Sequence, residues 1–243
     1  MNAIVIGASG AIASAIIQHY LELSEKHCVI AVSRKKFKES SIPQEFQQRI
    51  EWLHCDYTES AIQALTADLA DRSIEFTDVF ITNGILHAEN INPEKRVQAL
   101  QRASLFSVME VNACIPLLWV KYLQPLLKRG TGCIVTILSA RIGSIADNEL
   151  GGWYSYRMSK AALNMGIKTA SIEFARIAPN TTFLLYHPGT TDSSLSKPFQ
   201  KNVPEGKLFS PRFTAERLFS VIAQLPNSTN LFFKDWQGNS VEW

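Results

Sequence analysis

Residues 3–17 read AIVIGASGAIASAII, and this stretch decides the fold. Residues 3–6 are an apolar run typical of a buried strand, and apolar residues at helical spacing continue after the turn to Leu21. The small residues between them let the backbone approach a pyrophosphate, which the N–H groups and positive dipole end of a helix N-terminus stabilise. A tight turn that binds nothing has the same composition. The candidate dinucleotide ligands here are Gly7, Ser9, Gly10, Ala11 and Ile12.

Strand-like and helix-like segments alternate along the rest of the chain. This alternation predicts an α/β fold: a single-domain, Rossmann-type, doubly wound parallel sheet of about seven strands with helices on both faces, spanning residues 1–243. Any ligand is expected at the carboxyl ends of the strands. The expected strands are about 2–6, 28–33, 50–54, 78–82, 131–138, 181–187 and 230–234, and the expected helices about 11–23, 59–70, 95–128 (broken near its start), 153–178 and 213–225.

One long segment, about 190–212, has little periodicity and carries Pro198, Pro204, Gly206 and Pro211. Loops of this length in a compact domain are usually functional. We therefore expect a substrate loop here that acts as a mobile lid.

The composition is that of an ordinary globular protein, with 46% hydrophobic and 19% charged residues. A net charge of +2 gives no electrostatic reason to expect a nucleic-acid or membrane-surface partner. No leader is expected, because residues 3–6 already read as a strand, and no apolar run is expected to reach the ~18–20 residues of a membrane helix. The four cysteines are scattered, and three of them lie in expected strands or a buried helix, which suits reduced core thiols: Cys28, Cys55, Cys114 and Cys133. We therefore expect a cytoplasmic protein, and no metal site is predicted.

A second informative feature is the pair Tyr156 and Lys160 in Tyr-Arg-Met-Ser-Lys. Positions four residues apart on a helix share one face, so the phenol and the ammonium are expected to be neighbours. A cation beside a phenol favours the phenolate and lowers the phenol's pKa, which makes the pair a candidate general acid/base. An ordinary helix face produces the same spacing by chance.

Together these motifs resemble the short-chain dehydrogenase/reductase family in its short single-domain form. Segments 139–145 and 151–157 look most like the C-factor and sniffer-type carbonyl reductase branch. The glycine motif departs from the family pattern, because Ala11 and Ala13 stand where the second and third glycines are usual and Gly10 comes one position early.

The resemblance implies a catalytic set of Asn112, Ser139, Tyr156 and Lys160. In that set the serine hydroxyl binds the substrate carbonyl, and the tyrosine transfers the proton. The lysine bonds the nicotinamide ribose and lowers the tyrosine pKa. Ser144 is a rival to Ser139 further out in the loop. Pro116 lacks the N–H that would bond the carbonyl of residue 112, so that carbonyl is expected to be free and the helix to bend.

The end of the second expected strand predicts NADPH, with NAD less suited. Ser33 stands where an acidic residue would bond the ribose hydroxyls, and Arg34 can bond a phosphate. A solvated basic loop, continued by Lys35, Lys36 and Lys38, is the alternative.

Further cofactor contacts are implied by the family pattern. Asp56, followed by Tyr57, matches the aspartate that bonds adenine, although it could instead help to start the next helix. His187 is read as a packed histidine rather than a catalytic one. The remaining implied contacts are Asn83 and Gly84 at the ribose, and Pro188, Gly189, Thr191 and Ser193 at the nicotinamide carboxamide. Asn83 stands where alanine is usual and could instead stabilise the turn.

The implied function is an NADP(H)-dependent oxidoreductase that reduces a small-molecule carbonyl to an alcohol, or the reverse. The alternatives are a catalytically weak redox sensor or signalling protein on the same fold, and a dehydratase or epimerase. Arg141 could meet an anionic substrate or be ion-paired, and Trp153 and Tyr154 could wall the pocket or simply pack. A homodimer or homotetramer is expected through helices 104–128 and 153–178, where Gly166 and other small residues would allow close approach.

Overall fold

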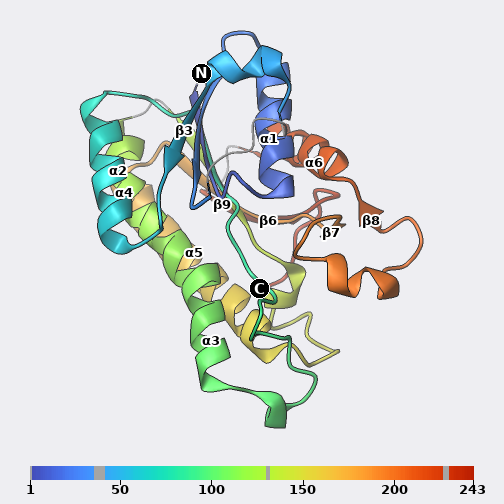
Figure 1. Ribbon diagram of the computed structural model, residues 1–243. Helices are drawn as coiled ribbons and strands as arrows, with labels where there is room; N and C mark the ends of the chain where they lie inside the picture. The colour runs from blue at the N-terminus through green and yellow to red at the C-terminus, as the bar shows by residue number, and fades with distance from the viewer. Residues whose placement is uncertain (1, 36–41, 130–131, 227–229) are drawn as a thin grey trace.

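The computed structural model describes residues 2–35, 42–129, 132–226 and 230–243 (Figure 1). Within these residues, seven strands form one parallel sheet in the order β3-β2-β1-β4-β5-β6-β9. This arrangement confirms the expected doubly wound sheet. The strands are β1 (Asn2–Ile6), β2 (Cys28–Ser33), β3 (Ile50–His54), β4 (Asp78–Ile81), β5 (Cys133–Leu138), β6 (Thr181–His187) and β9 (Leu231–Asp235).

Helices cover both faces of the sheet (Figure 1). On one side lie α2, α4 and α5, and on the other α1 and α6. The helices are α1 (Ala11–Glu22), α2 (Glu59–Asp71), α3 (Arg102–Met109), α4 (Ile115–Arg129), α5 (Tyr154–Ile177) and α6 (Pro211–Ala223).

The central strands are mostly apolar because both of their faces are buried. Successive side chains point to opposite faces. In β1, Ile4 and Ile6 therefore pack into the layer of α2, α4 and α5, whereas Ala3 and Val5 pack toward α1 and α6. All four are fully buried, and each isoleucine or valine contributes about 1.5–3 kcal/mol to the free energy of folding.

The strand register brings the carboxyl ends of the central strands to one edge. Ile6 of β1 pairs with Ile81 of β4, which pairs with Ile137 of β5. The segments after these strands therefore emerge side by side. The chain order reverses between β1 and β4, the place where ligands bind in doubly wound sheets.

The segment expected as one helix over 95–128 differs from that expectation. Residues 95–101 contain only the short 3-10 turn η3 (Val97–Ala99), and α3 begins at Arg102. A π-helical turn, η4 (Glu110–Cys114), then separates α3 from α4. Pro116 has no N–H to bond the carbonyl of residue 112. In the same turn the N–H of Ile115 donates to Glu110 O, five residues back, which is the π-helical pattern.

Two expectations drawn from the composition need correction, one about membrane-length apolar segments and one about the cysteines. The stretch Arg102–Lys128 is long and apolar enough, by length and composition, to cross a membrane. Its Trp119 and Leu123 are fully buried against the sheet, as in the core helix of a globular protein. Cys28 and Cys114 are exposed, so they are not core thiols.

The segment 190–212 is more ordered than a plain loop. Its ends pair as two short strands, β7 (Thr190–Thr191) and β8 (Leu208–Phe209), and between them lies the 3-10 helix η6 (Lys197–Asn202). Helix α6 begins at Pro211, two residues earlier than expected, because the hydroxyl of Ser210 accepts a hydrogen bond from Phe213 N.

Candidate active site

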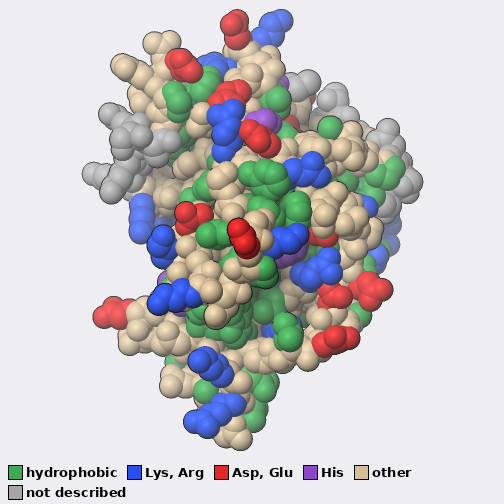
Figure 2. All heavy atoms as spheres, turned by 90° about the vertical axis from the view of Figure 1, so that its right-hand side faces the viewer, with side chains coloured by type: hydrophobic (Ala, Val, Ile, Leu, Met, Phe, Trp, Pro, Cys, Tyr) green, Lys and Arg blue, Asp and Glu red, His purple; other side chains and the backbone are tan. Residues whose placement is uncertain are grey.

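A cavity of about 790 Å³ opens at the carboxyl ends of the strands. Volumes of this size are typical of ligand sites. Figure 2 shows the side of the molecule that carries α6, where hydrophobic side chains gather near the middle and charges of both signs are interspersed around them. Twelve of the predicted site residues line the cavity: Gly10, Ala11, Ile12, Asn83, Gly84, Ser139, Tyr156, Lys160, Pro188, Gly189, Thr191 and Ser193.

The turn after β1 is built around Gly7. Its φ is +86°, and a Cβ there would lie 2.6 Å from Thr82 Oγ1 and 2.9 Å from Asn83 N. Its N–H donates to Val32 O over 3.0 Å and to the Tyr57 hydroxyl over 2.8 Å. A larger residue at position 7 would therefore push β1 away from β4.

The N-terminus of α1 faces the cavity without a side-chain cap. Its N-cap residue is Gly10, and residues 10–13 line the cavity. Uncapped N–H groups and the positive end of a helix suit an anion such as a pyrophosphate. The alanines that replace the usual glycines still leave this end of the helix open to the cavity, so the turn fits a dinucleotide.

The remaining residues predicted at the adenosine end lie outside the cavity. Ser9 is exposed, and the Ser33 hydroxyl donates to Lys35 O. Arg34 is exposed, with its guanidinium 5.7 Å from the centroid of the buried Tyr57 ring. Tyr57 braces the turn through Gly7. Lys36 and Lys38 lie outside the described residues.

Asp56 makes the contacts of a helix start. Its carboxylate accepts hydrogen bonds from Thr58 N at 2.9 Å and Thr58 Oγ1 at 2.8 Å, which lowers the pKa of Asp56. Thr58 in turn is the N-cap of α2 and accepts from Ala61 N. These bonds match the alternative to adenine binding, and the adenine role stays a prediction.

Helix α5 carries the phenol and the ammonium, and a distant carboxylate fixes its start. Trp153, the N-cap residue, has a left-handed backbone and offers no side-chain cap. The buried Glu94 accepts hydrogen bonds from Ser155 N, at 3.1 Å, and from the Ser155 hydroxyl. Glu94 therefore caps the helix from another segment and sets the position of Tyr156 just beyond.

Tyr156 and Lys160 lie on one face of α5, as the spacing predicts, and Lys160 Nζ is 5.9 Å from the Tyr156 ring centroid. The expected depression of the Tyr156 pKa is wrong: burial raises the pKa of Tyr156 to about 12. Burial also lowers the pKa of Lys160 to about 8. Desolvation of the two groups thus outweighs their attraction at this distance. The phenol is protonated at neutral pH, as a proton donor must be.

Asn112 lies in the π-helical turn and is fully buried. Its Oδ1 accepts from Ile85 N at 2.7 Å, while its Nδ2 donates to Ile85 O at 2.8 Å and to Ser159 Oγ at 3.0 Å. A Cβ on Gly84 would lie 3.4 Å from Asn112 Oδ1 and 3.7 Å from Lys160 Nζ. Asn112 thus ties the segment after β4 to α5 beside the lysine. Asn83 holds the same turn by donating to Val111 O.

The structure distinguishes Ser139 from Ser144, the other candidate for the serine that binds the substrate carbonyl. Ser139 follows β5, lines the cavity, and donates its hydroxyl proton to Asn164 Oδ1 over 2.6 Å. Ser144 lies outside the cavity lining and accepts a hydrogen bond from Asp147 N. Ser139 is therefore the serine that can meet a ligand beside Tyr156.

The segment after β6 also lines the cavity. Gly189 has a φ of +72°, and a Cβ there would lie 2.6 Å from the Phe209 ring. The Thr191 hydroxyl pairs with that of Thr214 at 2.8 Å. His187 also lines the cavity, and burial lowers its pKa to about 4, so its imidazole is neutral at pH 7.

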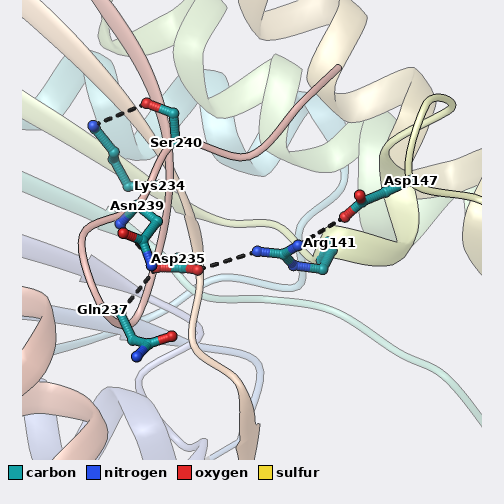
Figure 3. A network of polar contacts seen from close by, with 7 residues as sticks. All are labelled: Arg141, Asp147, Lys234, Asp235, Gln237, Asn239 and Ser240. Atoms are coloured by element: carbon teal, nitrogen blue, oxygen red, sulfur yellow. Dashed lines mark hydrogen bonds and ion pairs between the residues drawn. The ribbon is translucent and has the colours of Figure 1, made fainter.

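Arg141 is paired with two carboxylates (Figure 3). It lies 2.9 Å from Asp147 and 3.1 Å from Asp235. The Asp235 carboxylate also accepts from the backbone N–H groups of Gln237 and Asn239. Arg141 therefore fastens the loop after Ser139 to the end of β9, which matches the ion-paired reading.

Sequence reasoning missed much of the cavity wall. Arg157 donates to the carbonyls of Gly151 and Gly152 and so pins the loop before α5. Trp153 lines the cavity, and Tyr154 does not. Single apolar residues in loops carry no periodic signal, which is why the others were overlooked. The apolar wall comprises Leu86, Ile142, Leu150, Trp153, Phe199 and Val203.

Comparisons with known proteins agree with this architecture. A family model described as short chain dehydrogenase matches residues 1–204. The 1-hydroxy-2-glutathionyl-2-methyl-3-butene dehydrogenase of Rhodococcus sp. (strain AD45) is 28% identical over 186 residues, 76% of each chain. The C-signal protein of Myxococcus xanthus is 33% identical over 141 residues, 58% of this chain and 80% of that one.

Solved structures match the whole chain. A short-chain dehydrogenase/reductase from Burkholderia multivorans with bound NADP superposes with a TM-score of 0.82 at 22% identity, covering 100% of this chain and 99% of that one. The NADPH-bound carbonyl reductase from chicken fatty liver gives 0.81 at 21% identity, covering 100% and 98%. At these identities the likeness shows the fold.

Proposed function

The chain belongs to the short-chain dehydrogenase family of oxidoreductases, and on that premise we propose that it uses NADP(H) to reduce a carbonyl to an alcohol, or to run the reverse reaction. One observation carries the proposal. Ser139, Tyr156 and Lys160 meet in a single cavity that also contains the open N-terminus of α1. A proton donor, a group that can bond an oxygen, and an anion site are what this reaction needs of the protein.

The cofactor would be held along the edge of the sheet. The N–H groups at the start of α1 suit the pyrophosphate, and Gly84, Pro188 and Gly189 line the same cavity. Arg34, exposed beyond the end of β2, supports a 2′-phosphate and hence NADPH. When bound, NADPH would supply the hydride for the carbonyl carbon. Two of the superposed structures carry NADP or NADPH, which supports the same choice.

The protein's own groups handle the oxygen and its proton. The Tyr156 phenol, protonated at neutral pH, donates to the carbonyl oxygen as that oxygen gains charge. Ser139 lies at the same cavity and can hydrogen-bond that oxygen. Lys160, with a pKa of about 8, is mostly charged at pH 7 and stabilises the phenolate left behind. General acid catalysis of this kind contributes about 10²–10⁴-fold in rate.

The substrate we propose is a small carbonyl compound with an apolar body. Aliphatic and aromatic side chains line much of the cavity, and Trp153 and Phe199 lie with ring centroids 5.1 Å apart. The paired Arg141 offers no free charge for an anionic group. Aromatic and aliphatic ketones, aldehydes and quinones suit such a wall.

The test is oxidation of NADPH, followed by its absorbance, with a panel of aldehydes, diketones and quinones graded in apolar surface. The proposal expects turnover that rises with the apolar surface of the substrate. Tight binding of NADPH without turnover across the panel would contradict it, and would favour a sensing or signalling role. The 33% identity to the C-signal protein supports that second candidate.

A further inference from the structure

We propose that Asn164 is a positioning residue for Ser139: the orientation of its side-chain amide decides whether the Ser139 hydroxyl can donate to the substrate oxygen. This inference rests on the proposed carbonyl chemistry and deepens it. It assigns a role to a residue outside the cavity lining.

The contact joins the two elements that carry the reacting groups. Ser139 follows β5, and Asn164 lies on α5 four residues after Lys160. Positions 156, 160 and 164 therefore share one face of the helix. The two side chains are 4% and 3% exposed, and their atoms Oγ and Oδ1 are 2.6 Å apart. Among the described residues Asn164 is the hydrogen-bond partner of this hydroxyl, so the amide's orientation decides whether the hydroxyl proton points to Asn164 or into the cavity.

The amide carries an unsatisfied donor. With Oδ1 toward Ser139, Asn164 Nδ2 is buried without a hydrogen-bond partner among the described residues. An unpaired buried donor costs about 1–3 kcal/mol. A half-turn of the amide exchanges the oxygen and nitrogen in nearly the same space. Nδ2 then donates to Ser139 Oγ, and the atom left unpaired is a carbonyl oxygen, which proteins tolerate better.

The two orientations differ in what Ser139 offers the substrate oxygen. When Asn164 accepts the hydrogen bond from the Ser139 hydroxyl, Oγ presents only lone pairs to the cavity, and a carbonyl oxygen has no proton to give them. When Asn164 donates, Ser139 keeps its proton for a carbonyl oxygen, and the chain of hydrogen bonds from Nδ2 through Oγ to the substrate is mutually polarised. Reduction therefore requires the donating amide.

The Asn164→Asp variant isolates this requirement. A carboxylate has nearly the shape of the amide but only accepts, so it holds the Ser139 proton away from the substrate. We expect kcat for carbonyl reduction to fall about 10–100-fold at pH 8, because one donor to the developing oxyanion is lost. As the pH falls and the carboxyl group takes up a proton, it regains a donor, so kcat should recover. The affinity for NADPH should stay within about 2-fold, as expected for a side chain that lies outside the cavity lining and hydrogen-bonds Ser139.

Two further variants, Ser139→Ala and Tyr156→Phe, separate the role of Asn164 from other effects. In Ser139→Ala, adding Asn164→Asp should cost little more, because the two residues act as one unit. The Tyr156→Phe variant reports on the proposed function separately: if it reduces substrate normally, the acid/base assignment fails whatever Asn164 does. If Tyr156→Phe is inactive and Asn164→Asp matches the unmodified protein at every pH, the role of Asn164 is overturned. A full additional loss in the Ser139→Ala background overturns it as well.

A second variant at the same position keeps the proposal testable if Asn164→Asp does not fold. If Asn164→Asp does not bind NADPH, the uncharged Asn164→Leu replaces it. We expect Asn164→Leu to bind NADPH normally, to lose about 10-fold in kcat at every pH, and to show no recovery in acid, because it has neither donor nor acceptor. An unchanged kcat in Asn164→Leu would overturn the proposal.

Discussion

The ammonium of Lys160 donates a hydrogen bond to the backbone carbonyl of Leu138, the residue directly before Ser139, over 2.8 Å. This bond ties α5 to the end of β5, so the residues that each element brings to the cavity are held in one arrangement. It also leaves a charge buried at 3% exposure. The role proposed for Lys160 beside Tyr156 therefore comes at a cost in stability.

Replacing Lys160 should stabilise the protein at neutral pH. Burial lowers the pKa of Lys160 from 10.5 to about 8, so between these values the unfolded chain binds more protons and stability rises with pH. We expect Lys160→Met to raise the free energy of unfolding at pH 7 by about 1–2 kcal/mol, net of the lost bond to Leu138. This gain should vanish above pH 10.5. Thermal melts at both pH values, with the exposed Lys128→Met as control, check it; an equal gain at both would contradict a buried charge.

Arg34 should decide between the two nicotinamide cofactors. Its guanidinium is exposed directly after β2 and lies beside the Tyr57 ring. We expect Arg34→Asp to weaken NADPH binding at least about 10-fold, because it removes a charge-assisted phosphate contact and adds repulsion. NADH, which has no 2′-phosphate, serves as the internal control and should bind as before. Fluorescence titration measures both, and equal affinity of the unmodified protein for the two cofactors would rule out the preference.

Phe199 should hold the substrate loop over the cavity. Its ring lies 5.1 Å from that of Trp153 and 5.8 Å from that of His87, and His87 Nε2 lies 3.1 Å from Ser194 O. We expect Phe199→Ala to speed hydrogen exchange in residues 193–203 and to raise KM several-fold with little change in kcat.

The exposed Phe106→Ala, on α3, is the matched control for the lid. NADPH with substrate should slow exchange in the same segment of the unmodified protein. If the hydrogen-exchange rates of this segment change neither with ligand nor with the Phe199 substitution, a lid is excluded.

Self-association should use a different stripe of α5 from the one the sequence suggested. Gly166 faces its own subunit, because a Cβ there would lie 2.6 Å from Leu117 Cδ1. Met158, Met165 and Ile172, spaced by seven residues, share one helix face and are 48%, 66% and 58% exposed. Such an apolar stripe suits a second copy of the chain.

We expect light scattering at micromolar concentration to give a dimer or tetramer, and the double variant Met165→Glu with Ile172→Glu to shift it to monomer. Leu23→Glu, which changes an equally exposed leucine beyond α1, should leave the mass unchanged. A monomeric mass for the unmodified protein would refute the interface.

The fold was readable from the sequence because its determinants are local. Parallel strands buried on both faces are continuous apolar runs, and the ends of β1, β2 and β6 fall where those runs stop. The start of α3 was not readable, since residues 95–101 gave no terminating signal. The π-helical turn was missed because only the bend expected at Pro116, and not its geometry, follows from a missing N–H.

The site was readable only in part, for a related reason. Residues that follow strands closely, such as Ser139 and Gly189, line one cavity because the register of the sheet brings the strand ends to one edge. Phe199 and Asn164 depend on how a loop folds back and how a helix packs on β5, which no short motif records. The pKa of Tyr156 was mispredicted because its burial, not its neighbour four residues away, dominates.

The measurement that tests the account most directly is the rate of carbonyl reduction by Tyr156→Phe. The substitution removes the hydroxyl and keeps the ring, whose centroid lies 6.3 Å from that of Trp153. We predict that NADPH affinity and melting temperature stay near those of the unmodified protein, while kcat falls by about 10²–10⁴-fold. A Phe variant that reduces the same substrate at the unmodified rate would show that Tyr156 is not the acid.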